Sequence, residues 1–288
     1  MGRTSILLLI VLASAGCSSK PRIVVASKNF TESVIIGEIV AQLIERREPG
    51  FDVDRKLNLG GTLLAHEALK SGSIDLFPEY TGTALTAVLK KPVGGDAKAV
   101  LQQVRASYAP WGLEWLPPLG FDNSYAMVVR AATARENGLH TLSDAARRPE
   151  PWRLAIGYEF TQRPDGLNGL VKAYGLRVAG EPVAMDLGLL YTALRAKTGD
   201  LAAASATDGA LAGSEFVVLA DDRHYFPPYE CALVVRRDIL NRYPNLRATL
   251  TALSGRIPGQ TMRQMNKAVD VDHRPISDVA HDFVAQLK

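Results

Sequence analysis

One stretch of the chain, residues 75–83, combines an aromatic ring with the start of a predicted helix. An apolar run ends at Pro78, Tyr80 follows, and Gly82 permits a tight turn before an apolar helix expected over 84–89. The start of a helix offers free backbone N–H groups and a partial positive charge, and a tyrosine ring offers a flat π face. The stretch could therefore meet both ends of a small charged molecule. An ordinary βα turn with a partly buried tyrosine accounts for it equally well.

Motifs of catalysis and metal binding are scarce in the sequence. His66-Glu67 is not followed by the second histidine that a zinc-binding helix needs four residues on, and the five histidines are scattered. The chain has no Gly-x-Ser-x-Gly elbow, no Walker loop and no dinucleotide fingerprint. Gly60-Gly61 could cradle an anion, but a tight βα turn is the simpler interpretation. We therefore expect a binding protein rather than an enzyme, with no catalytic residue, no cofactor and no metal.

Composition and charge are those of an ordinary globular protein. The 288 residues are 47% hydrophobic and carry a formal charge of +3, and no Lys/Arg run exceeds two residues. Nucleic acid is therefore not an expected partner.

The N-terminus is typical of an exported protein. After a weakly basic start, residues 5–13 are apolar and small residues lead to Cys17, so we interpret residues 1–17 as a signal peptide. Residues 13–15 fit cleavage to a soluble protein, whereas Ala-Gly-Cys at 15–17 resembles a lipobox that would leave Cys17 lipidated. We favour the lipoprotein. The expected location is the periplasm or the outer face of the cytoplasmic membrane, with membrane contact only through such an anchor.

Two series of strands and helices follow. In the first, strands are expected over 22–26, 51–59 and 74–77, with helices over 32–48, 62–70 and 84–89. This alternation predicts a mostly parallel sheet with helices on both faces. Thr31 is the expected N-cap of the first helix.

The second series begins near residue 126, and everything after Asp238 is expected to be helical. We predict an α/β fold of two lobes, with 22–124 plus 230–288 in one lobe and 125–229 in the other. The chain would cross between them near 122–125 and near 226–229. A cleft between two lobes is a preferred place for a small ligand, and hinge closure is the usual motion there.

Six short motifs in order carry a resemblance to a known family. They are Ser27 to Glu32, Asp75 to Thr83, Arg163-Pro164-Asp165-Gly166, Asp186 to Tyr191, Thr207-Asp208-Gly209 and Phe226-Pro227-Pro228-Tyr229. Together they resemble the substrate-binding proteins of osmoprotectant ABC importers, which bind glycine betaine, choline or carnitine. The resemblance covers essentially the whole mature chain. It implies a bilobal fold like that of type II periplasmic binding proteins, an ABC permease as partner, and a monomer.

The resemblance also implies a ligand-binding set in this sequence. The tyrosines that match a cage for a quaternary ammonium are Tyr80, Tyr125 and Tyr229. The residues that match partners of a ligand carboxylate are Lys28, Thr83 and Arg163. Taken singly, each also has a plainer interpretation as a packed aromatic or a solvated surface residue.

Two positions depart from the family pattern. Ser205 stands where an aromatic residue is often found, so one wall of the cage would be missing. Asn123 stands where some relatives place an aspartate that would complement the cation. Both departures weaken the case for tight glycine betaine binding and leave open a weaker binder or a bulkier cationic ligand.

Two other classes of function remain open from the sequence. A binding protein for another small solute, such as an amino acid, would need an acidic partner for a primary ammonium. An exported enzyme or sensor on the same scaffold would need an acid/base pair in the cleft, for which Glu79 with Asp208 or His224 are the candidates.

Overall fold

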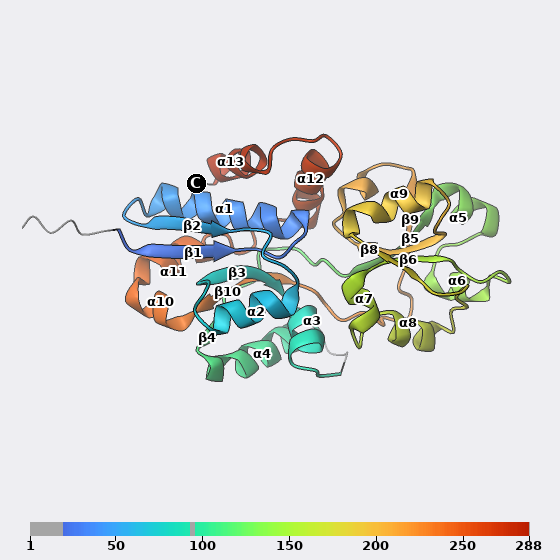
Figure 1. Cartoon of the computed structure of the whole chain (residues 1–288), viewed down its shortest axis with the longest axis horizontal. Coiled ribbons are helices and arrows are strands. Elements are labelled where there is room, and N and C mark those ends of the chain that lie inside the picture. The colour runs from blue at the N-terminus through green and yellow to red at the C-terminus, as the bar shows by residue number, and fades with distance from the viewer. Residues whose placement is uncertain (1–19, 93–95, 288) are drawn as a thin grey trace, which may run out of the picture.

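The computed structural model describes residues 20–92 and 96–287, which form two five-stranded sheets, each covered by helices (Figure 1). We call the sheet that begins the chain, with its helices, the first lobe and the other the second lobe. The predicted two-lobed α/β architecture is confirmed. The predicted signal peptide and Cys17 lie outside the described residues. Among the described helices, none combines the length and apolar character that crossing a bilayer requires.

The first lobe is built on a sheet of order β2-β1-β3-β10-β4. Its strands are β1 (Arg22–Ala26), β2 (Asp52–Lys56), β3 (Leu76–Tyr80), β4 (Leu113–Trp115) and β10 (Cys231–Arg236). The helices before β10 are α1 (Thr31–Arg47), α2 (Thr62–Lys70), α3 (Thr81–Thr83), the π-helical turn η1 (Ala84–Val88), α4 (Ala97–Tyr108) and η2 (Ala109–Trp111). Those after it are α10 (Arg237–Arg242), α11 (Pro244–Thr251), α12 (Gly259–Asp270) and α13 (Ile276–Gln286).

The second lobe repeats this plan with the order β7-β6-β8-β5-β9. Its strands are β5 (Tyr125–Arg130), β6 (Leu154–Gly157), β7 (Val183–Met185), β8 (Leu201–Ser205) and β9 (Phe216–Leu219). Its helices are α5 (Ala131–Asn137), α6 (Leu142–Arg147), α7 (Tyr158–Gln162), α8 (Leu167–Tyr174) and α9 (Leu190–Arg195), with single turns η3 (Leu187–Leu189) and η4 (Gly209–Ala212).

A mostly parallel sheet was expected, and the structure shows why one strand in each sheet departs from it. In the described sheets, β10 is antiparallel to both its neighbours and β5 is antiparallel to both of its own, while the other strands of each sheet share one direction. Both exceptions are the strands that receive the chain as it crosses from one lobe to the other. A crossing strand enters its sheet from the side that faces the other lobe, so it runs against the strands that end there.

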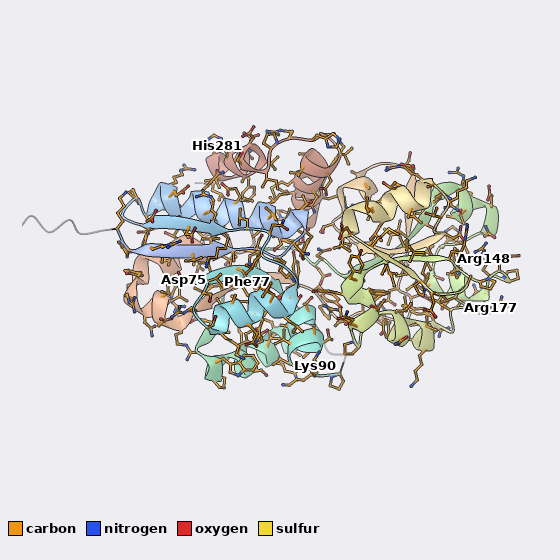
Figure 2. The ribbon with its side chains drawn as sticks, in the orientation of Figure 1. Asp75, Phe77, Lys90, Arg148, Arg177 and His281 are labelled. Carbon is orange, nitrogen blue, oxygen red and sulfur yellow. The ribbon has the colours of Figure 1, made fainter. Side chains whose placement is uncertain are left out.

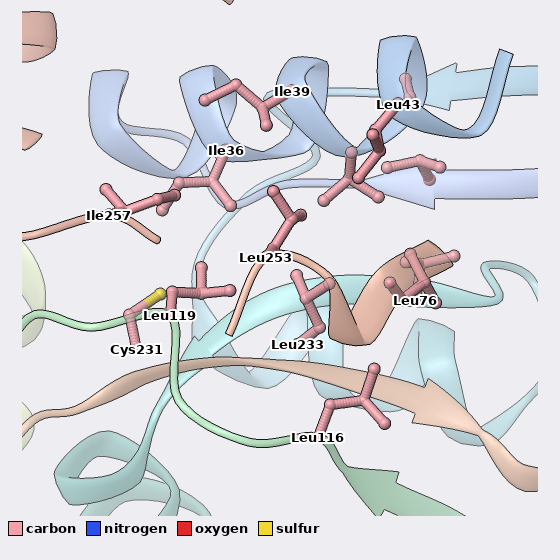
Figure 3. Packing of buried hydrophobic residues seen from close by; sticks show 14 of the residues in the cluster. Ile36, Ile39, Leu43, Leu76, Leu116, Leu119, Cys231, Leu233, Leu253 and Ile257 are labelled. Atoms are coloured by element: carbon pink, nitrogen blue, oxygen red, sulfur yellow. The ribbon is translucent and has the colours of Figure 1, made fainter. Parts of the chain in front are cut away.

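The core of the first lobe lies between α1 and the sheet. Ile36, Ile39 and Leu43, spaced three and four residues apart on α1, belong to one buried cluster with Leu76 and Leu233 of the sheet (Figure 3). These side chains are fully buried. Each contributes about 1.5–3 kcal/mol by leaving water, which makes the lobe a stable platform for residues at its edge.

The two crossings between the lobes run side by side. Asp122 and Glu230 form an antiparallel bridge, and the Asn123 N–H donates to the Tyr229 carbonyl at 3.1 Å. The Tyr229 N–H in turn donates to the Asp122 carboxylate at 2.6 Å. Tyr229, on the second of these segments, is thus held to the first through both its N–H and its carbonyl.

Two local predictions in the first lobe were wrong. The strand was expected to end at Phe77 but β3 continues to Tyr80, with Pro78 opposite Leu233. On its other side, β3 pairs with β1 only at Leu76. Proline has no N–H to donate, and at Pro78 no hydrogen bond to β1 is needed. Thr31 is not the N-cap of α1: that position is Phe30, and the Thr31 hydroxyl donates instead to Asp270 of α12 at 2.6 Å.

Candidate functional site

The carboxyl ends of the parallel strands of the two sheets face each other where the lobes meet. We call this region the interlobe interface. Its hydrogen bonds join Glu32, Thr62, Thr83, Thr86 and Asn266 of the first lobe to Glu159, Arg163 and Thr207 of the second. In open α/β sheets, ligands bind outside the carboxyl ends of the strands, so this region is the first candidate for a site.

The structure brings the six predicted site residues to the interlobe interface. Lys28 follows β1, Tyr80 ends β3 and Thr83 ends α3, all in the first lobe. From the second lobe, Tyr125 opens β5 and Arg163 follows α7. Tyr229 lies on the returning crossing. Residues separated by up to 201 positions are thus gathered at one place, and their contact with a ligand stays a prediction.

Arg163 lies at the centre of a buried hydrogen-bond cluster. Its guanidinium donates to the Asp165 carboxylate at 3.0 and 2.7 Å, which forms a bidentate ion pair. The same group donates across the interface to the Thr83 hydroxyl at 3.2 Å and the Thr86 hydroxyl at 3.0 Å. It also donates to the Tyr229 oxygen at 3.0 Å, and the Tyr229 hydroxyl donates to Asp165. Arg163 therefore ties the second lobe to both the first lobe and the crossing.

Lys28 forms a second buried ion pair. Its ammonium donates to Glu79 Oε1 at 2.6 Å, and the same oxygen accepts the Tyr80 N–H at 2.8 Å. The Lys28 ammonium also lies 4.7 Å from the centroid of the Tyr80 ring and 5.5 Å from that of Phe30. This geometry is that of a cation–π contact.

The other two predicted tyrosines form an aromatic group with a cation against it. The Tyr125 ring lies 5.8 Å from the Tyr229 ring, at 86° to it, and 4.8 Å from that of Phe160. The Arg163 guanidinium lies 5.5 Å from the Tyr125 centroid and 5.6 Å from the Tyr229 centroid. Burial raises the pKa of Tyr125 to about 12, and it raises those of Tyr80 and Tyr229 well above the usual value. All three remain neutral phenols that can present a ring face to a cation.

Glu32 is a buried residue of the interlobe interface that the sequence analysis did not single out. It lies in the first turn of α1 and is only 3% exposed. Its Oε1 accepts from the Tyr80 hydroxyl and the Asn123 amide, both at 2.7 Å. Its Oε2 accepts from the Thr207 hydroxyl and from the Asn266 amide at 3.0 Å. The only sequence signal for Glu32 was its place in the motif that runs from Ser27. Its four hydrogen-bond donors come from distant segments of the chain, so their spacing in the sequence does not reveal them.

Burial raises the pKa of Glu32, and the four hydrogen bonds oppose that rise because they favour the ionised form. The carboxylate is thus held by the first lobe, the crossing and the second lobe at once. Its neighbours also explain the departure at Asn123. An amide donates to Glu32, whereas an aspartate at that place would set two carboxylates within hydrogen-bond distance of each other.

Ser205, the other departure, pairs directly with Tyr125 across β8 and β5. Its N–H donates to Asp208 Oδ2 at 3.1 Å, and the same oxygen accepts the Tyr191 hydroxyl at 2.8 Å. Because Ser205 is the residue of β8 opposite Tyr125, β8 places no aromatic ring beside the Tyr125 ring.

The acid/base pair considered for an enzyme is not assembled in the described residues. Glu79 forms an ion pair with Lys28, and Asp208 accepts a hydrogen bond from the Tyr191 hydroxyl. His224 is exposed in a turn, where its backbone N–H donates to the Asp221 carbonyl. No hydrogen bond between these three side chains is found in the part of the chain that the structure covers.

A tight backbone contact closes the interface near Gly209. This residue opens η4 of the second lobe, which packs against α12 of the first, and a Cβ added there would come 2.5 Å from the backbone of Lys267. We therefore expect Gly209→Ala to hold the lobes apart and to weaken binding of a ligand between them at least tenfold, with each lobe still folded. Gly213→Ala is the matched control, because a Cβ there meets nothing within 4 Å. Calorimetric titration of both variants checks this, and equal affinities would contradict it.

Asp208 gives the interface a pH dependence. Burial raises its pKa to about 7, more strongly than the Ser205 N–H and the Tyr191 hydroxyl lower it, and the charges of Glu32 and Asp270 raise it further. A carboxyl with a raised pKa binds more protons in the folded than in the unfolded protein, so stability is lost as pH rises from about 4 to about 7. Asp208→Asn should therefore flatten this loss, which melting temperatures of both proteins from pH 4 to 8 would show. Parallel curves would count against the assignment.

Two surface hollows lie away from the interlobe interface. One is lined by Leu69, Trp111 and Arg236 on the first lobe. The other is lined by Asn137, Arg148 and Pro149. Figure 2 shows Arg148 at the end of the second lobe that is far from the first lobe. Neither hollow gathers side chains from both lobes, so neither competes with the interface as the predicted site.

Comparison with known proteins gives a consistent result. A family model described as the substrate binding domain of ABC-type glycine betaine transport system matches residues 21–286. The chain is 34% identical to a glycine-betaine-binding protein of Pseudomonas aeruginosa, over 96% of this chain and 91% of that protein. It is 31% identical to a carnitine transport binding protein of Listeria monocytogenes, over 95% of this chain and 89% of the other.

A solved structure is similar over most of this chain. It is described as the crystal structure of a glycine betaine/carnitine/choline ABC transporter. It shares 30% identity with this chain and superposes with a TM-score of 0.77, covering 92% of this chain and 98% of its own. The two-lobed fold is therefore shared with this known structure.

Proposed function

The chain belongs to the family of substrate-binding domains of ABC-type glycine betaine transport systems, a family of binding proteins rather than enzymes, and we propose that it captures a quaternary ammonium solute between its two lobes. The protein then delivers the solute to an ABC permease. The relatives described above are named for glycine betaine and carnitine, which share a trimethylammonium group.

One observation carries this proposal: cations already lie against the rings of all three predicted cage tyrosines. Lys28 lies over Tyr80, and Arg163 lies against Tyr125 and Tyr229. A trimethylammonium has no N–H to donate, so only shape and the negative faces of aromatic rings can recognise it, at roughly 0.5–2 kcal/mol per ring. Micromolar affinity needs about −8 kcal/mol, so the polar end of the ligand and desolvation must supply the rest.

The polar end would meet the second predicted set of residues. Lys28, Thr83 and Arg163 lie beside the tyrosines, and each carries a donor that a ligand hydroxyl or carboxylate could share. Both basic groups are at present bonded to carboxylates of the protein, at Glu79 and Asp165.

The alternative of an amino-acid ligand fits this interface less well. A primary ammonium donates three hydrogen bonds and needs acceptors. Glu32 is the obvious acidic partner, but each of its oxygens already accepts two hydrogen bonds. A quaternary ammonium has no N–H to donate, so it can be attracted by the charge of Glu32 without forming a hydrogen bond to either carboxylate oxygen.

Binding would couple to closure of the two lobes. We propose that 22–124 plus 230–288 and 125–229 are the bodies that move, with the paired crossings at Asp122 and Glu230 as the hinge. The closed surface would be the form that the permease recognises. We also propose that the protein is exported, is lipidated at Cys17 and acts as a monomer.

Calorimetric titration with matched ligand pairs tests the function. Choline is compared with ethanolamine, and glycine betaine with glycine, so that each pair differs only in methylation of the nitrogen. We expect at least one methylated ligand to bind with a Kd at least 100-fold lower than its unmethylated counterpart. Binding of an unmethylated ligand as tightly as its methylated counterpart, or no binding of choline, glycine betaine and carnitine alike, would overturn the proposal.

A further inference from the structure

Among the described residues, one buried carboxylate lacks a cationic partner. Six carboxylates are buried there: Glu32, Glu38, Asp75, Glu79, Asp165 and Asp200. Five of them form an ion pair with an arginine or lysine at 2.6 to 3.5 Å. Within residues 20–92 and 96–287, Glu32 alone among the six has no such pair.

The four partners of Glu32 are neutral, and all of them can donate. The two asparagine amides can only donate through nitrogen, and the hydroxyls of Tyr80 and Thr207 complete two hydrogen bonds to each oxygen. The first turn of α1, where Glu32 lies, adds the positive end of a helix dipole over 17 residues. This arrangement fits an ionised carboxylate whose charge is spread over donors but not neutralised.

The buried basic groups of the interlobe interface are already neutralised. Lys28 is paired with Glu79 and Arg163 with Asp165, and both pairs are almost completely shielded from water. The charges within these two pairs cancel, so among the six buried carboxylates Glu32 is the one whose charge no cation offsets. Asp208, which is partly exposed, adds further negative charge as pH rises through its pKa of about 7. A zwitterionic ligand would leave the charge of Glu32 in place. Its carboxylate would also have to draw Lys28 from Glu79 or Arg163 from Asp165, leaving a buried carboxylate without its cation.

A ligand with one positive charge and no carboxylate would offset the charge of Glu32. It would meet the charge of Glu32 through the Tyr80 ring, whose hydroxyl donates to that carboxylate, and it would leave both ion pairs intact. We infer that this protein prefers a net-cationic quaternary ammonium alcohol, of which choline is the simplest, over zwitterionic betaines, and that Glu32 sets this preference. The inference rests on the proposed function and narrows the class of its ligand.

The test compares choline with glycine betaine on the full chain, by calorimetry at one pH and ionic strength. Both ligands carry the same trimethylammonium group and differ in a hydroxymethyl against a carboxylate. We expect a Kd for choline at least tenfold lower than that for glycine betaine. Equal affinities, or tighter binding of glycine betaine, would overturn this inference and leave the proposed function standing. Binding of neither ligand would overturn this inference, and the proposed function would fall with it only if carnitine also failed to bind.

Glu32→Gln tests the assigned residue, since it keeps size and removes charge. The ratio of the two Kd values should shift toward glycine betaine at least tenfold. Glu38→Gln is the matched control: Glu38 is a buried glutamate on the same helix, is paired with Arg55 and lies outside the interface, so the ratio should stay as in the wild type. Circular dichroism confirms folding of both variants. An unchanged ratio in folded Glu32→Gln would refute the role of Glu32, and the wild-type ratio decides the preference even if the variant fails to fold.

Discussion

Asp165→Ala is expected to lower the free energy of unfolding by about 3–5 kcal/mol, because it leaves the buried Arg163 guanidinium without its counter-charge. Asp165 is fully buried and also accepts the Tyr229 hydroxyl, so the loss reaches the crossing between the lobes. Urea unfolding followed by circular dichroism and by tryptophan fluorescence measures the effect.

The control for this prediction is an exposed ion pair in the same lobe. Glu215 pairs with Arg195 at 2.9 Å, and about half of each side chain is exposed to water. Glu215→Ala should therefore cost less than about 1 kcal/mol. If the two variants lost stability equally, burial of the Arg163–Asp165 pair would not be what makes it important.

Replacing both Tyr80 and Tyr229 by leucine is expected to weaken binding of a quaternary ammonium ligand roughly 100-fold. Two desolvated ring faces at roughly 1–2 kcal/mol each account for that factor. Leucine keeps an apolar side chain in a buried position, so the change removes the π face rather than the core contact. Calorimetric titration with choline provides the measurement.

Phenylalanine at the same two positions separates the ring from its hydroxyl. The double phenylalanine variant keeps both π faces and loses the hydrogen bonds to Glu32 and Asp165. It should bind choline less than tenfold more weakly than the wild type. A loss as large as that of the leucine variant would mean that the hydroxyls, not the rings, hold the ligand.

Much of the fold could be predicted from local patterns in the sequence. The apolar face of α1 recurs every three or four residues, and the change from one series of elements to the next marks the crossings. Short elements were missed where that periodicity fails. The helix α7 is only five residues long and begins at Tyr158 directly after a buried strand, and α5 has few apolar residues.

The site could be predicted only where residues belong to recognisable motifs. Tyr80, Arg163 and Tyr229 stand in such motifs, and the structure brings them to one interface. Glu32 and its donors could not be found in this way, because Asn266 lies 234 residues further along the chain and only folding brings it near. The pairing of Lys28 with Glu79 likewise depends on the adjacency of two strand ends.

The central claim is that aromatic rings from both sides of the interlobe interface surround a quaternary ammonium group. A crystal structure with the arsenic analogue of choline tests it most directly, because anomalous scattering locates the head-group atom without interpretation of weak density. The account predicts an arsenic peak within about 6 Å of the ring centroids of Tyr80 and Tyr229. A peak found only elsewhere, such as the hollow beside Trp111 and Arg236, would contradict it.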